Sequence, residues 1–131
     1  MPFTKISEKT YQAYIERVRT KEGKHVFWLS KPRSACRVGC VIFNNVFPNV
    51  EVHMKSSDVW YVVSGEGVFI LSGKLENVVK SRPDECAAGS ILGGKLRRVK
   101  TGDIIDIPAG VPHQIDARGK FLVMLIIKIN A

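Results

Sequence analysis

The 131-residue chain lacks the long apolar runs and the cysteine patterns that mark membrane and disulfide-rich proteins. Its longest apolar run, residues 121–127, is too short to span a bilayer, and the start MPFTKISEK has no apolar signal segment. The three cysteines, Cys36, Cys40 and Cys86, are odd in number and have no CxxC spacing. We therefore expect reduced, mostly buried thiols, no membrane association and a cytoplasmic location.

Long basic runs are also absent, although the formal net charge is +8. The longest run is Arg97-Arg98, and no basic stretch alternates with aromatic residues in a stacking pattern. Nucleic acid is therefore the least favoured partner. The excess charge is concentrated in residues 1–40, which hold nine Lys or Arg and three acidic residues. A solvated lysine-rich surface explains this excess, and a small anionic substrate would also suit it.

The sequence does contain one helical pattern followed by many short strand patterns. In residues 7–20, Tyr11, Ile15 and Val18 share one face at helical spacing, and Ser7 is in place to cap the first turn. Residues 74–95 are irregular and are interpreted as an extended hairpin or a surface excursion. The other runs number about eight: HVFWLS, RVGCVIF, VEVHM, VWYVVSG, GVFILSG, DIIDIP, HQID and FLVMLIIKI.

These elements predict one domain with a single hydrophobic core. A chain of this length can bury such a core without disulfides or metals. Short strands separated by turn residues are typical of an all-β sandwich or barrel. We expect residues 1–24 to form a helical segment that packs on a barrel formed by residues 25–131.

One of the three histidines lies between two carboxylates, in the stretch VEVHMKSSDVW. Side chains alternate along a strand, so Glu51 and His53 face the same way. A turn over residues 55–57 would let the next strand return alongside and bring Asp58 close to them. A second predicted hairpin, in which GDIIDIP runs through AGVP into HQID, puts His113 directly after a turn. If the two hairpins face each other, the imidazoles and carboxylates form a set that suits Fe(II), Mn(II) or Zn(II).

The spacing of these residues resembles the two sequence motifs of the cupin superfamily. Asp58 is followed seven residues later by Gly65, and GDIIDIPAGVPH has the family's glycines, proline and histidine at the family's spacing, ending at His113. The resemblance covers residues 49–116. It implies a double-stranded β-helix, which is a small jelly-roll barrel, often dimeric, with a metal near its open end. The chain is thus interpreted as a small single-domain cupin with a short N-terminal helix that forms a homodimer.

The first motif departs from the family pattern, which usually begins with HxH and contains a later glutamate. Glu51 stands in place of the first histidine and Asp58 in place of the glutamate, whereas His53 and His113 match. Aspartate is shorter than glutamate by about 1.5 Å, so Glu51 could supply the carboxylate if Asp58 does not reach the ion. The predicted metal site is therefore Glu51, His53, Asp58 and His113. The alternative is a degenerate cupin without metal, in which these residues are structural or face solvent.

Three further residues are candidates for the site. Trp60 is two residues after Asp58, and Ile115 is two residues after His113, so each points to the same face of its strand as the candidate ligand. Both could therefore line a substrate pocket above the ion. Core packing explains these two residues equally well. His25 lies outside both motifs and is only a weak candidate ligand.

Two classes of function follow from this pattern. The first is a metal-dependent enzyme acting on a small, anionic metabolite, with Glu51 or Asp58, whichever is not a ligand, as general base. The cupin resemblance allows dioxygenase, isomerase or lyase chemistry, among which the fold does not choose. The second is a non-catalytic module that binds or senses a small molecule, which the substituted first motif favours.

Overall fold

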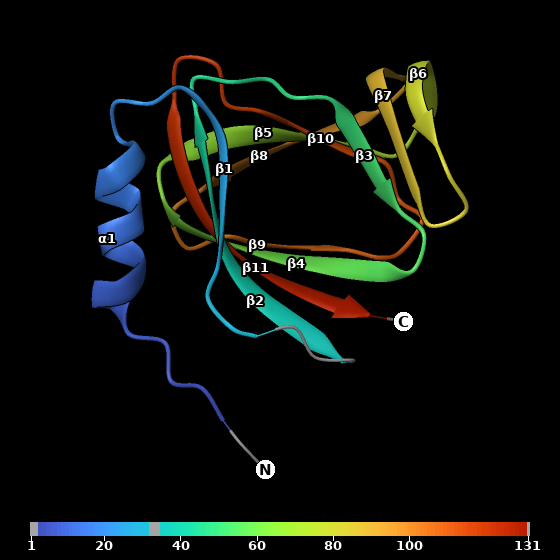
Figure 1. Cartoon of the computed structure of the whole chain (residues 1–131). Coiled ribbons are helices and arrows are strands. Elements are labelled where there is room, and N and C mark those ends of the chain that lie inside the picture. Colours follow the sequence, from blue (N-terminus) through green and yellow to red (C-terminus); the bar gives the residue numbers. More distant parts are fainter. Residues whose placement is uncertain (1–2, 32–34, 131) are drawn as a thin grey trace.

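The computed structural model describes residues 3–31 and 35–130 of the chain. One helix, α1 (Glu8–Val18), precedes the strands and lies against one side of them (Figure 1). It begins where the sequence predicted, because the Ser7 hydroxyl oxygen accepts a 3.4 Å hydrogen bond from the Thr10 N–H group. The predicted helix is thereby confirmed. Within the described ranges, no helix has both the length and the apolar character needed to cross a bilayer.

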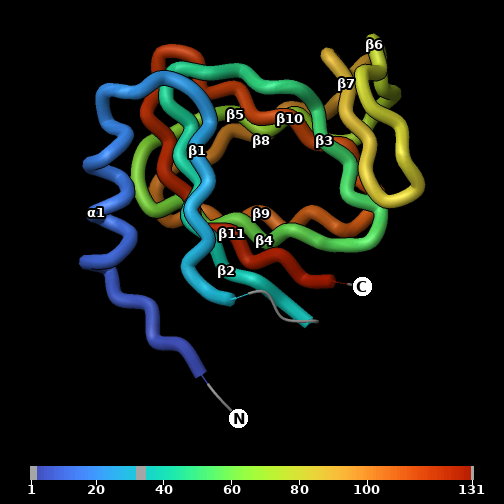
Figure 2. The backbone as a smooth tube through the Cα atoms, viewed as in Figure 1, coloured from blue at the N-terminus to red at the C-terminus, as the bar shows by residue number. Residues whose placement is uncertain are grey.

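The described residues form eleven strands in two antiparallel sheets. Sheet A has the order β1 (Gly23–Trp28), β2 (Cys36–Asn44), β11 (Phe121–Asn130), β4 (Ser56–Ser64) and β9 (Ile104–Ile107). Sheet B has the order β6 (Lys74–Ser81), β7 (Glu85–Leu92), β3 (Val50–His53), β10 (His113–Asp116), β5 (Glu66–Leu71) and β8 (Lys95–Lys100). The sheets face each other as a jelly-roll barrel (Figure 2). The all-β fold with a short N-terminal helix is therefore confirmed.

The chain crosses from one sheet to the other at both places where the sequence predicted a hairpin. Strand β3 is paired with β7 and β10, whereas β4 is paired with β11 and β9. Strands β9 and β10 likewise belong to different sheets. The hairpin prediction was wrong, because both edges of β3 are occupied and β4 cannot pair with it. The candidate ligands converge across the barrel from facing sheets instead.

Strands β6, β7 and β8 were not recognised as separate strands in the sequence. Strands β6 and β7 form a hairpin, which was one of the two interpretations of residues 74–95. Most side chains of β6 and β8 are exposed, so these strands lack the alternation of apolar and polar residues that reveals a half-buried strand. The β6–β7 hairpin projects at one end of the barrel (Figure 1).

The hydrophobic core has two parts, one on each face of sheet A. The larger part fills the barrel and includes Phe43, Trp60 and Phe69. The smaller part lies outside the barrel, where Ile15 and Val18 of α1 pack on sheet A. Its sheet residues are Cys40, Ile42 and Val123. The helix therefore covers the outer face of the sheet and leaves the barrel interior to the candidate site.

The C-terminal end of α1 is joined to sheet A through Asn44. The Asn44 side-chain amide donates hydrogen bonds to the carbonyl oxygens of Val18 and Arg19, both at 3.2 Å, and of Lys21 at 2.9 Å. These bonds satisfy carbonyl groups that the end of a helix leaves without partners. The chain then enters β1 at Gly23, close to the predicted start of the barrel at residue 25.

Candidate metal centre

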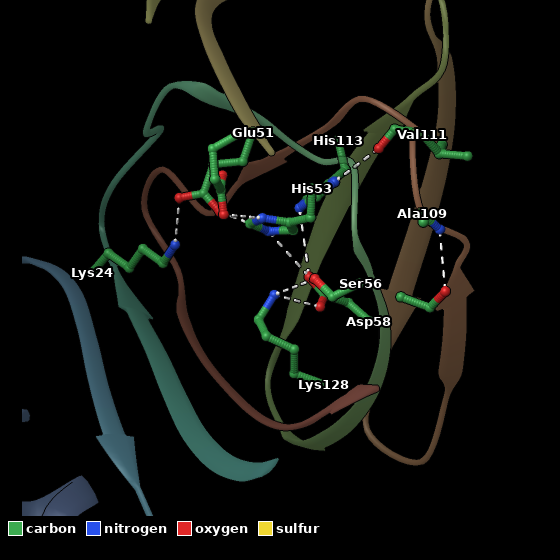
Figure 3. A network of polar contacts seen from close by, with 11 residues as sticks. Lys24, Glu51, His53, Ser56, Asp58, Ala109, Val111, His113 and Lys128 are labelled. Atoms are coloured by element: carbon green, nitrogen blue, oxygen red, sulfur yellow. Dashed lines mark hydrogen bonds and ion pairs between the residues drawn. The ribbon is translucent and has the colours of Figure 1, made fainter. Parts of the chain in front are cut away.

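The two motif histidines meet inside the barrel on neighbouring strands of sheet B. His53 ends β3, and His113 begins β10, where it pairs with Glu51. The two imidazole ring centroids are 5.1 Å apart. The His113 side chain is 4% exposed and that of His53 is 11% exposed. The convergence predicted from the sequence is therefore present (Figure 3).

Each histidine has its Nδ1 atom engaged with an acceptor. His53 Nδ1 lies 2.7 Å from Glu85 Oε1, and His113 Nδ1 lies 3.1 Å from the carbonyl oxygen of Val111. A carboxylate and a carbonyl can only accept, so both Nδ1 atoms carry hydrogen and donate. In the neutral tautomer the lone pair of each ring is then on Nε2. This is the arrangement in which histidines bind metals through Nε2.

Two carboxylates face the same Nε2 atoms. Glu51 Oε2 and Asp58 Oδ2 each lie 3.4 Å from His53 Nε2, and Asp58 Oδ2 lies 3.8 Å from His113 Nε2 (Figure 3). Asp58 is 1% exposed, and neither its Oδ2 atom nor His113 Nε2 has a hydrogen-bond partner within the described part of the chain. Buried polar atoms without partners are costly, so we expect a cation or a proton to bind between Asp58 Oδ2 and His113 Nε2.

The distances fit a single divalent ion. With bonds of about 2.1 Å, neighbouring ligand atoms on one ion lie about 3.0 to 3.4 Å apart. The two 3.4 Å separations match, and the 3.8 Å separation needs only a small adjustment. Ligand atoms of Glu51, His53 and His113 all lie within 4.8 Å of one another. Two imidazoles with one or two carboxylates suit iron, manganese or zinc.

Two lysines that the sequence reasoning missed are paired with the two carboxylates. Lys24 Nζ lies 3.1 Å from Glu51 Oε1, and Lys128 Nζ lies 2.7 Å from Asp58 Oδ1 (Figure 3). Both lysines come from sheet A, on β1 and β11. Each binds the carboxylate oxygen that faces away from the histidines. The second oxygen of each carboxylate therefore remains directed at the imidazoles.

The environment shifts the pKa values of three members of the cluster. Burial alone would raise the pKa of Glu51, but the hydrogen bond from His53 and the charge of Lys24 together lower it well below the ordinary value. Burial opposes charge on His53, yet Glu51, Asp58 and Glu85 together raise its pKa. Burial lowers the pKa of His113, which favours its neutral, metal-binding form. A proton on His53 would therefore compete with a metal for the same position.

Hydrogen bonds from the backbone join the turn of the second motif, which precedes His113, to residues of the first motif. The Gly110 N–H group donates a 2.8 Å hydrogen bond to the carbonyl oxygen of His53. Gly110 has a φ angle of +84°, which only glycine adopts without strain. The Ala109 N–H group also donates a 3.1 Å bond to Ser57 Oγ (Figure 3). These bonds fix the turn that presents His113 beside β3.

The remaining sequence candidates lie at different distances from this cluster. Trp60 is buried and lines both a cavity of about 170 Å³, shared with His53 and Asp58, and a narrow one of about 10 Å³ beside His113. Ile115 lines only the narrow cavity. His25 is outside the site, because its Nε2 atom lies 2.9 Å from the carbonyl oxygen of Lys21. The three cysteines are thiols, with Cys40 buried and the others half-buried.

Fold and site together define a small jelly-roll barrel with a candidate metal centre between its two sheets. No family model and no curated protein matches the sequence. Solved structures match strongly in shape, and one of them is named a cupin protein, from Bacteroides fragilis. Its TM-score is 0.57 at 16% identity, over 85% of this chain and 79% of that one. The chain has the cupin fold, as its motifs predicted.

Two other similar structures carry named activities. One is the DMSP lyase DddQ from Ruegeria pomeroyi, with a TM-score of 0.61 and 14% identity over 82% of this chain. The matched region is 47% of that lyase, so the chain spans about half of its length. Another is Pac13 from Streptomyces, described as a nucleoside dehydratase. It has a TM-score of 0.58 and 18% identity, over 85% of this chain and 72% of that one.

Proposed function

We propose that this protein is a metal-dependent enzyme that acts on a small anionic molecule bound in the barrel. The observation that carries the proposal is the convergence of acceptor atoms from Glu51, His53, Asp58 and His113. Two of these atoms, Asp58 Oδ2 and His113 Nε2, are buried without a partner among the described residues. A divalent cation balances this set of atoms more completely than one proton does.

Each residue of the cluster then has a role. Asp58, His53 and His113 would hold the ion. Glu51 lines the same 170 Å³ cavity as Asp58 and is the more exposed of the two carboxylates. A bound iron, manganese or zinc ion would supply Lewis-acid polarisation of a substrate oxygen. Glu51 is the candidate general base because it is 39% exposed at the cavity, although its lowered pKa makes it a weaker base than an ordinary glutamate.

Lyase or isomerase chemistry suits the site best among the reactions that the cupin resemblance allows. A carboxylate that can accept a proton, Glu51, and an ammonium group that can donate one, Lys128, border the same cavity. Two of the similar structures are named as a lyase and a dehydratase, which supports this choice by analogy of fold.

Elemental analysis of protein purified without an affinity tag tests the proposal. We expect about one divalent ion per chain, and loss of this ion in His53→Ala and His113→Ala. Asp58→Asn should lower the metal content, whereas Glu51→Gln should retain metal and lose turnover. The reverse result would exchange the roles of the two carboxylates. Metal-free protein, with no uptake that either histidine substitution alters, would refute the proposal.

A second candidate function is a non-catalytic module that binds or senses a metabolite. Lys24 and Lys128 favour it, because each neutralises one carboxylate without any ion. A thermal-shift screen with small acids and sugars, followed by turnover assays on each hit, separates the two functions. Saturable binding without product would support the module and count against the enzyme.

We also retain the predictions of a homodimer and of a cytoplasmic location. Four large apolar side chains of the adjacent strands β4, β9 and β11 are more than 40% exposed, which gives a second copy a surface to cover. These residues are Tyr61, Ile104, Ile127 and Ile129. Sedimentation of the wild type should give a dimer, and Ile127→Lys should shift it toward monomer. A monomeric wild type at micromolar concentration would contradict the prediction.

A further inference from the structure

The cavity beside the histidines has a mixed lining of cations and large apolar side chains. Its polar border consists of Glu51, His53 and Asp58 together with the ammonium groups of Lys24 and Lys128. The rest of the lining is apolar: Val26, Trp28, Val41, Trp60 and Ile126. A ligand that fills the cavity therefore meets charge on one side and hydrocarbon on the other.

The part of the cavity next to the histidines holds only a few ligand atoms. Its volume is about 170 Å³, below the range of about 300 to 1,000 Å³ that is typical of sites for drug-sized ligands. At the density of liquid water, about 30 Å³ per molecule, this space holds roughly six non-hydrogen atoms. The cavity is open to solvent on one side, so a larger ligand would extend out of it. A phosphate group alone would use nearly the whole space, whereas a carboxylate leaves room for a short carbon chain.

The charge of the cavity favours an anion once the metal is bound. Glu51 and Asp58 are balanced by Lys24 and Lys128, so a divalent ion leaves two positive charges in excess. A lysine ammonium has three N–H donors. Lys128 uses one on Asp58 at 2.7 Å and has a weak contact of 3.5 Å with Ser56 Oγ. It therefore has donor capacity left for a ligand oxygen.

Trp60 adds apolar surface to the cavity. The residue is 4% exposed and lines the cavity together with Trp28. Its indole Nε1 is buried and has no hydrogen-bond partner in the part of the chain that the structure describes. A ligand in the cavity therefore meets the apolar part of the indole.

Trp28 gives the cavity a firm apolar wall. It pairs across the sheet with Gly39, which has no side chain to keep the indole away from β2. The Arg37 guanidinium lies 3.8 Å from the centre of the indole ring. Arg37 also pairs with Lys128 across β2 and β11, so it adds positive charge next to the cavity.

We infer that the substrate is a short-chain carboxylic acid of about three or four carbons. Its carboxylate binds at Lys128, and its short chain packs on Trp28 and Trp60. This inference rests on the proposed function, since the metal supplies the excess charge. It goes beyond that function by specifying the charge, the size and the anchoring residues of the ligand.

Isothermal titration of matched three-carbon ligands into the metal-loaded protein tests the inference. We expect propanoate and 2-hydroxypropanoate to bind at least tenfold more tightly than propanamide, and octanoate to bind no more tightly than propanoate, because the rest of its chain lies outside the cavity. Lys128→Met should weaken acid binding by about 10- to 100-fold without lowering metal content, because Lys128 contacts Asp58 Oδ1 and leaves Oδ2 facing the histidines.

Lys9→Met, on the exposed side of α1, is the matched control and should leave acid binding unchanged. Equal affinity for acid and amide in protein that contains metal would overturn the inference while leaving the proposed function intact. Octanoate binding that is tighter than propanoate binding, or acid binding that survives Lys128→Met, would also overturn it. A metal-free protein would instead be a failure of the proposed function, which elemental analysis of the same samples detects.

Discussion

Glu85 is the residue that fixes the orientation of His53. Its Oε1 atom lies 2.7 Å from His53 Nδ1, and it belongs to β7, the neighbour of β3 in sheet B. A carboxylate behind a metal-binding imidazole holds the ring and its tautomer in place. Glu85 is therefore a positioning residue for the candidate metal centre, although it lies outside both sequence motifs.

Removal of this carboxylate should weaken metal binding without removing a ligand. We expect Glu85→Ala to lower metal affinity by about 10- to 100-fold and Glu85→Gln, which keeps an acceptor oxygen, to lower it less. Competition with a chelator measures the affinity, and NMR of the imidazole nitrogens reports the tautomer of His53. Glu76→Ala, on the exposed strand β6, is the control. An unchanged tautomer and affinity in Glu85→Ala would show that Glu85 has no positioning role.

Cys40 illustrates how burial controls a thiol. It lies between sheet A and α1, and burial raises its pKa to about 11 from the usual 9.0. Below pH 9 the thiol is protonated in both the folded and the unfolded chain, so it has no effect on stability. Between pH 9 and 11 only the unfolded chain loses the proton, and the free energy of unfolding falls.

Two measurements check this behaviour of Cys40. At pH 8 a thiol reagent should label Cys36 and Cys86 in the folded protein and reach Cys40 only on unfolding. From pH 9 to 11 the wild type should lose on the order of 2 kcal/mol more stability than Cys40→Ala. Parallel pH profiles for the two proteins, or rapid labelling of Cys40 in the folded state, would contradict the shifted pKa.

At the level of elements, the pairing of β1 with β2 positions Trp28 in the wall of the cavity beside the histidines. Trp28 lies opposite Gly39, where an added Cβ atom would be 2.9 Å from the indole Cε3 atom and 3.2 Å from Ile126 Cγ2. Neither neighbour is free to move far, because both pack inside the barrel. The glycine is therefore required by the close approach of the indole to the sheet.

We expect Gly39→Ala to displace Trp28 and to destabilise the protein by about 1 to 3 kcal/mol. Denaturant unfolding measures the loss, and tryptophan fluorescence reports the displaced indole. Gly89→Ala, at an exposed position of β7, is the matched control, because its new Cβ would lie 3.3 Å from the Asn77 Cβ atom and 3.8 Å from the Asn77 carbonyl oxygen. Equal stability of the two variants would mean that Trp28 adjusts without cost.

Elements with local sequence patterns were predictable, whereas exposed strands and long-range contacts were not. The helix, eight of the strands and the meeting of His53 with His113 followed from local patterns and motif spacing. The exposed strands β6 and β8 could not be predicted, because a strand with solvent on both faces has no alternation of apolar and polar residues. Lys24, Glu85 and Lys128 were missed because each reaches the site through pairing between distant segments. A prediction of strand register would have found Lys128, which pairs with Asp58.

At the level of the whole molecule, the candidate ligands connect the two sheets of the barrel. Asp58 comes from β4 of sheet A, whereas Glu51, His53 and His113 come from β3 and β10 of sheet B. The helix α1 and its apolar cluster lie on the outer face of sheet A and do not join it to sheet B. An ion in the cluster would therefore link the sheets where Asp58 faces the two histidines.

Metal removal should for this reason act on the barrel as a whole. A ligand at 100 times its dissociation constant stabilises the folded state by about 2.7 kcal/mol, so metal should raise Tm by on the order of 10 °C. Hydrogen exchange should slow most at β3, β4 and β10 and least at the exposed edge strand β8. Asp58→Asn isolates the link between the sheets, because it leaves all ligands of sheet B in place. If this variant gained as much Tm from metal as the wild type, Asp58 would not be part of the centre and the ion would bind to sheet B alone.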